Sequence, residues 1–273
     1  MKNVILFAFA LVANLSFSQY EYEDMRLLSS EYEFEEGSTE TLYGDNVVLR
    51  KKPSTESKAI DTLSIGSEVK ILENSRKEIV VNGKTSYWYK VKSNKGTGYV
   101  AGGFIALDSR EINGGKYMVI VAEANEESKF RVRYLKNGEF YGKEGALYTY
   151  SFVLRVHDGR GVEGVESMLL LDFMAESCGA DGGYTYLFNN GNRLINAIHC
   201  AEVGDGGFWF SEKLTFPDER GWGTHIGYER EVGQPMDGDH DWYQSKKDAL
   251  TLEWKEDHFE PNVSEFDFGE EDW

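Results

Sequence analysis

Short runs of alternating apolar and polar residues, separated by turn dipeptides, extend through most of the chain. Apolar and charged side chains alternate over residues 130–134, and Asn137-Gly138 follows shortly after. Asn82-Gly83 separates two further apolar runs in the same way. Alternation with a period of two is typical of a half-buried strand, and Asn-Gly is typical of a two-residue hairpin turn. The pattern therefore predicts an all-β fold built from antiparallel hairpins.

The stretch from residue 45 to residue 107 contains about five such runs, broken at Pro53 and Gly66. Proline cannot donate to a strand ladder, so it ends the first run. A stretch this short buries only a modest core, and most of its large apolar side chains are needed inside. We expect a small, partly open barrel with a core of Val48, Leu63, Val69, Trp88, Val91 and Val100.

The order of motifs in this stretch points to a family. It opens with Val47-Val48-Leu49-Arg50 shortly before Pro53, and it closes with Trp88-Tyr89-Lys90-Val91 and Gly98-Tyr99-Val100. This order resembles the bacterial SH3-type (Src-homology-3-like) domain over residues 45–107. Many relatives alternate Asn and Val before the Arg and carry Trp at the place of Tyr99. Both differences preserve the apolar character of the core.

The resemblance implies a binding module of the cell envelope rather than a catalyst. In such domains aromatic and polar residues bind peptide or peptidoglycan, and the matching candidates here are Tyr87, Tyr89 and Tyr99. The alternative is structural, because small barrels need large side chains such as Trp88 and Tyr99 to fill their core.

Residues 116–256 predict a second, larger all-β unit. Short strands and turn signals recur there at regular spacing, which is typical of an antiparallel β-sandwich or barrel. Val165–Phe173 could instead form a helix, although it is bounded by glycine and lacks a clear 3.6-residue period. We recognise no family in this part, so its role is not predicted.

The first 18 residues have the features of a secretory signal peptide. Lys2 precedes an apolar run from Val4 to Ala13, and Ser16-Phe17-Ser18 forms a small-x-small cleavage site. The run is too short to span a bilayer, and no later run is longer. We expect an exported protein, periplasmic or secreted, without a membrane span after removal of the signal.

The formal net charge of −18 is concentrated at the two ends. Residues 20–45 hold nine acidic residues and one arginine, and residues 253–273 hold nine acidic residues and one lysine. We expect an acidic linker at 19–44 and an acidic tail at 257–273, solvated and partly disordered, with recruitment of a basic partner as the alternative. The nearly balanced middle of the chain offers no electrostatic surface for nucleic acid.

The two cysteines, Cys178 and Cys200, predict one disulfide bond. An exported chain matures in an oxidising compartment, where such a pair is normally joined. Closing a loop of about 20 residues would stabilise the fold by roughly 3 kcal/mol. The alternatives are two buried thiols or one reactive thiol.

A catalytic alternative uses Cys178 as nucleophile and His225 as base. Cell-wall cysteine endopeptidases often follow bacterial SH3-type domains and use a thiolate activated by a histidine. Their nucleophile opens a helix, which lowers its pKa, whereas Cys178 precedes a glycine-rich turn at 179–183. The Asp-Cys-Ser-Gly context of that family is also absent. We therefore predict no catalytic residues.

A calcium loop is a second alternative, because Asp237, Asp239 and Asp241 place carboxylates at every second position. The EF-hand pattern then fails, since Trp242 stands where the loop needs glycine. The five histidines form no pair with zinc-ligand spacing. We predict no metal and no cofactor, and keep a calcium-stabilised structural or adhesion protein as an alternative.

The sequence as a whole favours an exported, non-enzymatic binding protein of the bacterial cell envelope. Its expected partners are a peptide, peptidoglycan or an envelope protein, and no nucleic acid.

Overall fold

The computed structural model describes residues 26–29, 31–124, 127–175, 177–221, 223–236 and 239–265. The expected signal peptide at 1–18, the start of the acidic linker and the end of the acidic tail at 266–273 lie outside the described residues.

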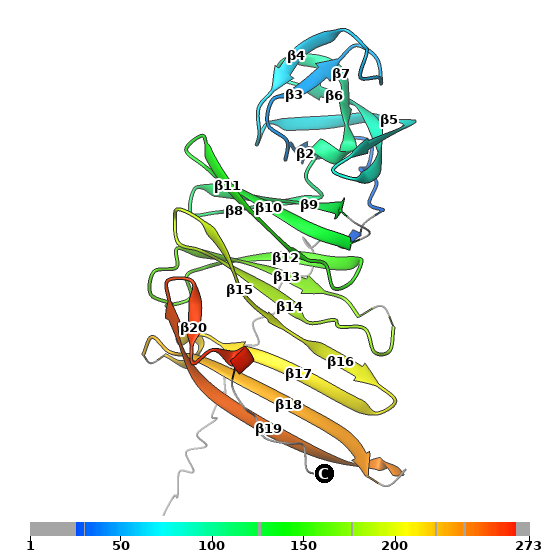
Figure 1. The fold of residues 1–273 in the computed structure, drawn as a ribbon. Helices are drawn as coiled ribbons and strands as arrows, with labels where there is room; N and C mark the ends of the chain where they lie inside the picture. The colour runs from blue at the N-terminus through cyan, green and yellow to red at the C-terminus, as the bar shows by residue number, and fades with distance from the viewer. Residues whose placement is uncertain are drawn as a thin grey trace, which may run out of the picture.

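The described part of the chain is almost entirely β structure, arranged in four antiparallel sheets (Figure 1). The predicted fold class, a small barrel followed by a larger antiparallel unit, is confirmed. The one α-helix among the described residues is α1 (Pro217–Arg220). No helix in these ranges is long and apolar enough to cross a membrane.

The first sheet curls into the small barrel at the top of Figure 1. In sheet order its strands are β2 (Thr39–Thr41), β5 (Glu68–Val81), β6 (Lys84–Ser93), β7 (Gly96–Ala101), β3 (Val47–Arg50) and β4 (Ala59–Leu63). A 3-10 turn, η2 (Gly102–Phe104), follows β7.

The core of the first sheet contains most of the side chains expected there. Leu63, Val69, Val91 and Val100 are buried in one cluster, and Trp88 is buried in a smaller one. Val48 is the exception: it is half-buried, while its neighbours in β3 point inward. Residues next to each other in a strand face opposite sides, so the sequence-based choice was wrong by one position.

Three further sheets complete the molecule. The second sheet contains β8 (Asp108–Ile112), β9 (Gly115–Ala124), β10 (Glu127–Lys136) and β11 (Glu139–Ala146). The third contains β1 (Leu28–Ser29), β12 (Ser151–Asp158), β13 (Ser167–Phe173), β14 (Tyr184–Asn189) and β15 (Leu194–Cys200). The fourth contains β16 (Glu202–Asp205), β17 (Phe208–Thr215), β18 (Ile226–Met236), β19 (Asp239–Lys255) and β20 (His258–Glu260), and η3 (Val263–Glu265) follows it.

Successive sheets share apolar cores, which makes the molecule a stack of layers (Figure 1). One face of the third sheet packs against the second sheet around Phe130 and Leu171, and its other face packs against the fourth sheet around Phe188 and Tyr228. A smaller cluster around Met118 joins the second sheet to the first. The third sheet is thus covered on both faces.

Burial on both faces explains the sequence of β13. Its residues are buried except Asp172, and a strand covered on both sides reads as a continuous apolar run rather than an alternating one. The helical alternative for Val165–Phe173 is therefore wrong, because the missing alternation reflects two apolar neighbours and not a helical period.

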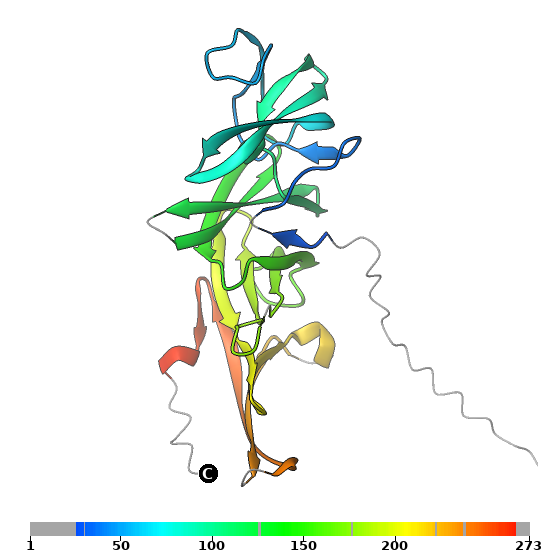
Figure 2. The same ribbon diagram turned by 90° about the vertical axis from the view of Figure 1, so that its right-hand side faces the viewer.

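The first described residues of the acidic linker contact both the first sheet and the third (Figure 2). Leu28 pairs with Phe152 of β12 and is fully buried, whereas Phe34 inserts into the core of the first sheet. Arg26 donates to both carboxylate oxygens of Glu40 at 2.7 and 3.0 Å. We call residues 26–29 and 31–34 the strap.

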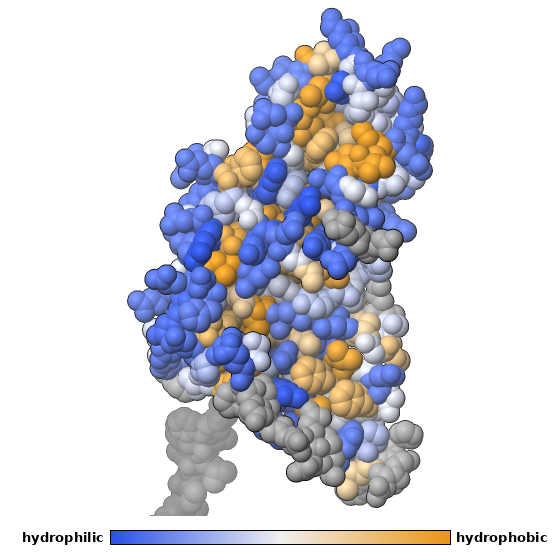
Figure 3. Space-filling view, in the orientation of Figure 1, coloured by the Kyte–Doolittle hydropathy of each residue, from blue (hydrophilic) through white to orange (hydrophobic). Residues whose placement is uncertain are grey.

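The surface in the view of Figure 3 is mostly hydrophilic, with apolar atoms in small separated groups. Scattered apolar groups of this kind are normal for a protein surface and do not by themselves mark an interface.

Candidate functional site

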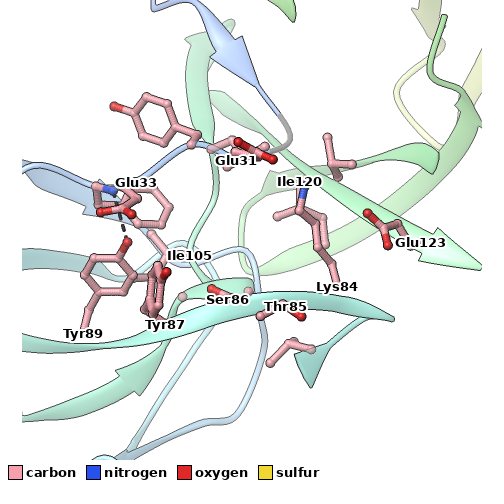
Figure 4. Close-up of a pocket in the computed structure, with 17 residues that line it drawn as sticks. Glu31, Glu33, Lys84, Thr85, Ser86, Tyr87, Tyr89, Ile105, Ile120 and Glu123 are labelled. Atoms are coloured by element: carbon pink, nitrogen blue, oxygen red, sulfur yellow. Dashed lines mark hydrogen bonds between the residues drawn. The ribbon is translucent and has the colours of Figure 1, made fainter. Parts of the chain in front are cut away.

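A cavity of about 530 Å³ lies where the first sheet meets the second (Figure 4). The strap forms one wall through residues 31–34, and β6 forms another through Lys84–Tyr87 and Tyr89. The third wall comes from β9, and Gly102 and Gly103 of η2 complete the lining. Cavities of this size accommodate small organic ligands or short peptides.

The hairpin between β5 and β6 is attached directly to β9. Its turn residues Asn82 and Gly83 both have positive φ, 55° and 80°, as a type I′ turn requires. The N–H of Glu123 in β9 donates to the carbonyl of Asn82 at 3.1 Å. A Cβ on Gly83 would lie 1.9 Å from the carbonyl oxygen of Glu123, so only glycine permits this contact. The turn therefore holds two walls of the cavity together.

Gly102 allows η2 to approach β6 closely. A Cβ at this position would lie 2.5 Å from Oγ of Ser86 and 2.8 Å from Cε2 of Tyr89. Both of these side chains line the cavity. The absence of a side chain at Gly102 thus sets the position of the cavity wall.

Two of the three predicted ligand-binding tyrosines line the cavity. Tyr89 is 2% exposed, and its hydroxyl accepts a hydrogen bond of 3.3 Å from the N–H of Phe34 in the strap (Figure 4). Burial raises the pKa of Tyr89 to about 12. Tyr87 is half-buried and more accessible. Tyr99 lies elsewhere, packed against the cluster that contains Trp88.

Four charged side chains line the cavity, from three different elements. Glu33 of the strap is bound by Arg76, whose Nη1 donates to its carboxylate at 2.7 and 2.9 Å. Glu31 of the strap and Glu123 of β9 lie closer to Lys84, and their charges oppose the effect of burial on its pKa.

Lys84 is half-buried in the wall of the cavity. Burial is the largest influence on its ammonium and leaves the pKa of Lys84 below the ordinary value. Among the described residues, no carboxylate lies within 4.0 Å of its Nζ. Figure 4 shows its side chain extending toward the side of the cavity where Glu31 and Glu123 lie. The cavity thus contains charges of both signs without a direct ion pair between them.

Residues 45–106 match the family described as bacterial SH3 domain. The match covers the first sheet from before β3 to η2, in agreement with the resemblance expected from the motifs.

These residues form a bacterial SH3 domain.

No curated protein and no solved structure matches the chain. The bacterial SH3 domain supplies the β6 and η2 walls of the cavity, whereas the strap and β9 come from outside the matched residues. Such a domain suggests a module that binds the cell wall or peptidoglycan.

The predicted disulfide is absent from the structure. Cys178 and Cys200 are both free thiols, the first exposed and the second buried. Cys200 ends β15 and packs in the core between the third and fourth sheets, where burial raises the pKa of its thiol. Cys178 lies in the loop before β14, outside that core. The spacing of the two cysteines in the sequence therefore did not predict their environments, because one lies in an exposed loop and the other in a core between two sheets.

Cys178 and His225 lie near opposite ends of the fourth sheet. The residue after Cys178 donates its N–H to Gly204 of β16 at 2.9 Å, and Gly204 lies across β17 from Gly233 of β18. His225 directly precedes β18, and seven residues of that strand lie between His225 and Gly233. The eight residue steps from His225 to Gly233, at about 3.3 Å each, span roughly 26 Å, too far for a thiolate–imidazole pair.

The alternative calcium loop falls where the structure describes no side chains. Asp237 lies outside the described residues, and Asp239 and Asp241 begin β19 without described side chains. Elsewhere in the described ranges, no three His, Cys, Asp or Glu residues are grouped as metal ligands.

A second polar group, not anticipated from the sequence, holds the loop before β14. His199 of β15 contacts Asp181 through Nε2 at 2.8 Å and Thr185 through Nδ1 at 2.9 Å. The Tyr148 ring stacks on its imidazole at 3.5 Å and covers it. Thr185 is buried and the imidazole is covered, so this group fastens the loop rather than presenting a nucleophile.

Tyr87 and Tyr89 were named from the sequence, whereas Lys84, Glu31 and Glu123, which line the same cavity, were not. These charged residues belong to segments far apart in the chain, and nothing in their local sequence distinguishes them from other surface charges. The Asn82-Gly83 turn was the nearest available signal, because Lys84 directly follows this turn and begins β6.

Proposed function

We propose that the protein is an exported, non-enzymatic binding protein of the bacterial cell envelope. Its ligand would be a peptide or the peptide stem of peptidoglycan, received in the cavity between the bacterial SH3 domain and β9. The observation that carries the proposal is this cavity of about 530 Å³, because Tyr87, Tyr89 and Lys84 of the SH3 domain line it.

The shape and lining of the cavity support a peptide ligand. Aromatic rings and aliphatic side chains supply apolar contact, and the hydroxyls of Thr85 and Ser86 supply hydrogen-bonding groups. The cavity is lined by polar and charged groups as well as by apolar side chains. In a ligand site, apolar side chains supply contact area, and the polar groups fix the orientation of the ligand. The signal-peptide features of residues 1–18 support export, and the wide separation of Cys178 from His225 supports a role without catalysis.

The test is sedimentation of the mature chain, residues 19–273, with purified peptidoglycan sacculi. Thr85→Trp places a bulky ring at an exposed position of β6 that lines the cavity. Thr97→Trp makes the same change at an exposed position of β7, outside the cavity lining. We expect Thr85→Trp to weaken binding at least tenfold and Thr97→Trp to bind as the unmodified chain does.

Two results would contradict the proposal. Failure of the unmodified chain to sediment with peptidoglycan would remove the cell-wall ligand, and equal binding by both variants would place the ligand site outside this cavity. Melting temperatures of the two variants establish that both are folded.

A further inference from the structure

The charged side chains that line the cavity indicate which charges its ligand should have. Glu33 is already paired with Arg76, so its charge is balanced within the protein. Lys84, Glu31 and Glu123 remain, and among the described residues none of them forms an ion pair with another. Glu31 and Glu123 are exposed, whereas Lys84 is half-buried. A half-buried charge is normally compensated by a partner of opposite sign, because partial loss of water is costly.

The three charges come from three walls and are held apart by the fold. Lys84 directly follows the Asn82-Gly83 turn, which is attached to β9 beside Glu123. Glu31 projects from the strap, whose position is set by the Phe34–Tyr89 contact. The side chains can therefore approach a molecule in the cavity without rearrangement of the backbone.

We propose that the cavity binds a zwitterionic peptide group, in which a carboxylate contacts Lys84 and an ammonium contacts Glu31 or Glu123. This inference rests on the proposed function and specifies the ligand class of the same site. A single carboxylate would satisfy Lys84 but would face the two glutamates, and a single ammonium would satisfy a glutamate but would face Lys84. A group that carries both charges matches both kinds of side chain.

Electrostatic coupling within the cavity agrees with this assignment. The charges of Glu123 and Glu31 favour the protonated form of Lys84 against the effect of burial. A ligand carboxylate beside Lys84 would add to this effect, because a negative charge also favours the protonated form. Charge-assisted hydrogen bonds of this kind are stronger than neutral ones, so their loss should be measurable in affinity.

The probe is a set of soluble muropeptides released from purified peptidoglycan by lysozyme. One portion is left unmodified, one is amidated so that its carboxylates become carboxamides, and one is N-acetylated so that its amines lose their charge. Calorimetric titration into the full mature chain compares the three. We expect each modification to weaken binding about tenfold, which corresponds to about 1.4 kcal/mol.

Variants assign each charge to its partner. Lys84→Met should weaken binding of the unmodified probe about tenfold and remove the penalty of amidation, whereas Lys84→Arg should retain most of the affinity. The double variant Glu31→Gln/Glu123→Gln should remove the penalty of N-acetylation. Lys92→Met and Glu78→Gln, exposed in the same sheet and outside the cavity lining, are the matched controls. If a protein side chain and a ligand group contact each other, removing both weakens binding by less than the sum of the two separate losses. This non-additivity identifies the contact.

The outcomes separate the two proposals. If the unmodified chain binds all three portions equally, the zwitterionic assignment is overturned while peptide binding stands. If amidation weakens binding equally in the unmodified chain and in Lys84→Met, the carboxylate is bound elsewhere and the assignment is also overturned. If no portion binds, the proposed function itself fails.

Discussion

At the residue scale, the two cysteines differ more in environment than their sequence context indicates. Cys178 is exposed in a loop, and Cys200 is fully buried between two sheets. A thiol reacts through its thiolate and only where a reagent can reach it. The two residues should therefore behave differently toward alkylation.

We expect iodoacetamide to label one thiol in the folded protein at pH 8 and two after unfolding in guanidinium chloride. Peptide mapping should place the first label on Cys178, because burial keeps Cys200 protonated and inaccessible. Cys178→Ser should abolish the fast reaction. Absence of any label before reduction would instead establish the disulfide and contradict the free thiols.

The buried phenol of Tyr89 should make the free energy of unfolding decrease at alkaline pH. Burial raises its pKa to about 12, above the ordinary value of 10, so the folded state favours the neutral form. This contribution is fully present below pH 10 and is lost as the pH rises through about 12. At pH 11 the loss is about 1.4 kcal/mol.

Denaturant unfolding at pH 9 and pH 11 checks this expectation. Tyr89→Phe should lose less stability between the two pH values than the unmodified protein, by about 1 kcal/mol. At pH 9 it should be less stable by about 1 kcal/mol, because the N–H of Phe34 loses its acceptor. Tyr243→Phe, at an exposed position, is the control. An identical pH dependence in all three proteins would contradict the role of Tyr89.

At the element scale, the strap is the segment for which the amino-acid composition and the structure differ most. Its acidic residues predict a solvated linker, yet its aromatic residues lie at every second position and face the first sheet. Phe34 contacts the ring of Tyr89 edge-on at 5.3 Å. The acidic residues of the strap next to these aromatic residues, Glu31 and Glu33, remain exposed. High charge and ordered structure therefore coexist in one segment.

Removing the Phe34 side chain tests the strap directly. We expect Phe34→Ala to lower the free energy of unfolding by about 3 kcal/mol, because a buried aromatic ring is lost and leaves a void. Phe208→Ala, at a position 40% exposed, should cost less than about 1 kcal/mol. Urea denaturation measures both. Equal effects of the two substitutions would mean that the strap does not stabilise the first sheet.

At the scale of the whole molecule, the bacterial SH3 domain is one layer of a continuous stack (Figure 1). Its core includes Phe34 from the strap, and its contact with the second sheet is made by a cluster around Tyr43 and Met118. The cavity needs walls from the strap and from β9 as well. The matched residues by themselves are therefore not a complete ligand site.

This organisation predicts that residues 44–110 alone bind peptidoglycan at least tenfold more weakly than residues 19–273. Sedimentation with sacculi measures binding, and circular dichroism records whether the fragment folds. A fragment that binds as tightly as the whole chain would contradict a site shared between layers. An unfolded fragment would agree with the contribution of Phe34 to the core.

Local patterns in the sequence determined the strands, the hairpins and the identity of the SH3 domain. Asn82-Gly83 and Asn137-Gly138 form turns with positive φ, as predicted, because few other residues tolerate that conformation. Alternation identified the strand over residues 130–134 for a similarly local reason, since side chains on a strand alternate between two faces.

Only the tertiary structure decided which faces meet and which side chains share a site. The burial of Val47 and Leu49 in place of Val48 depends on which face of β3 turns inward, and the apolar run of β13 depends on a neighbouring sheet on each side. Lys84, Glu31 and Glu123 line one cavity because three distant segments pack together. Long-range packing of this kind leaves no periodic trace in the chain, whereas turns and strands depend on the conformations of neighbouring residues.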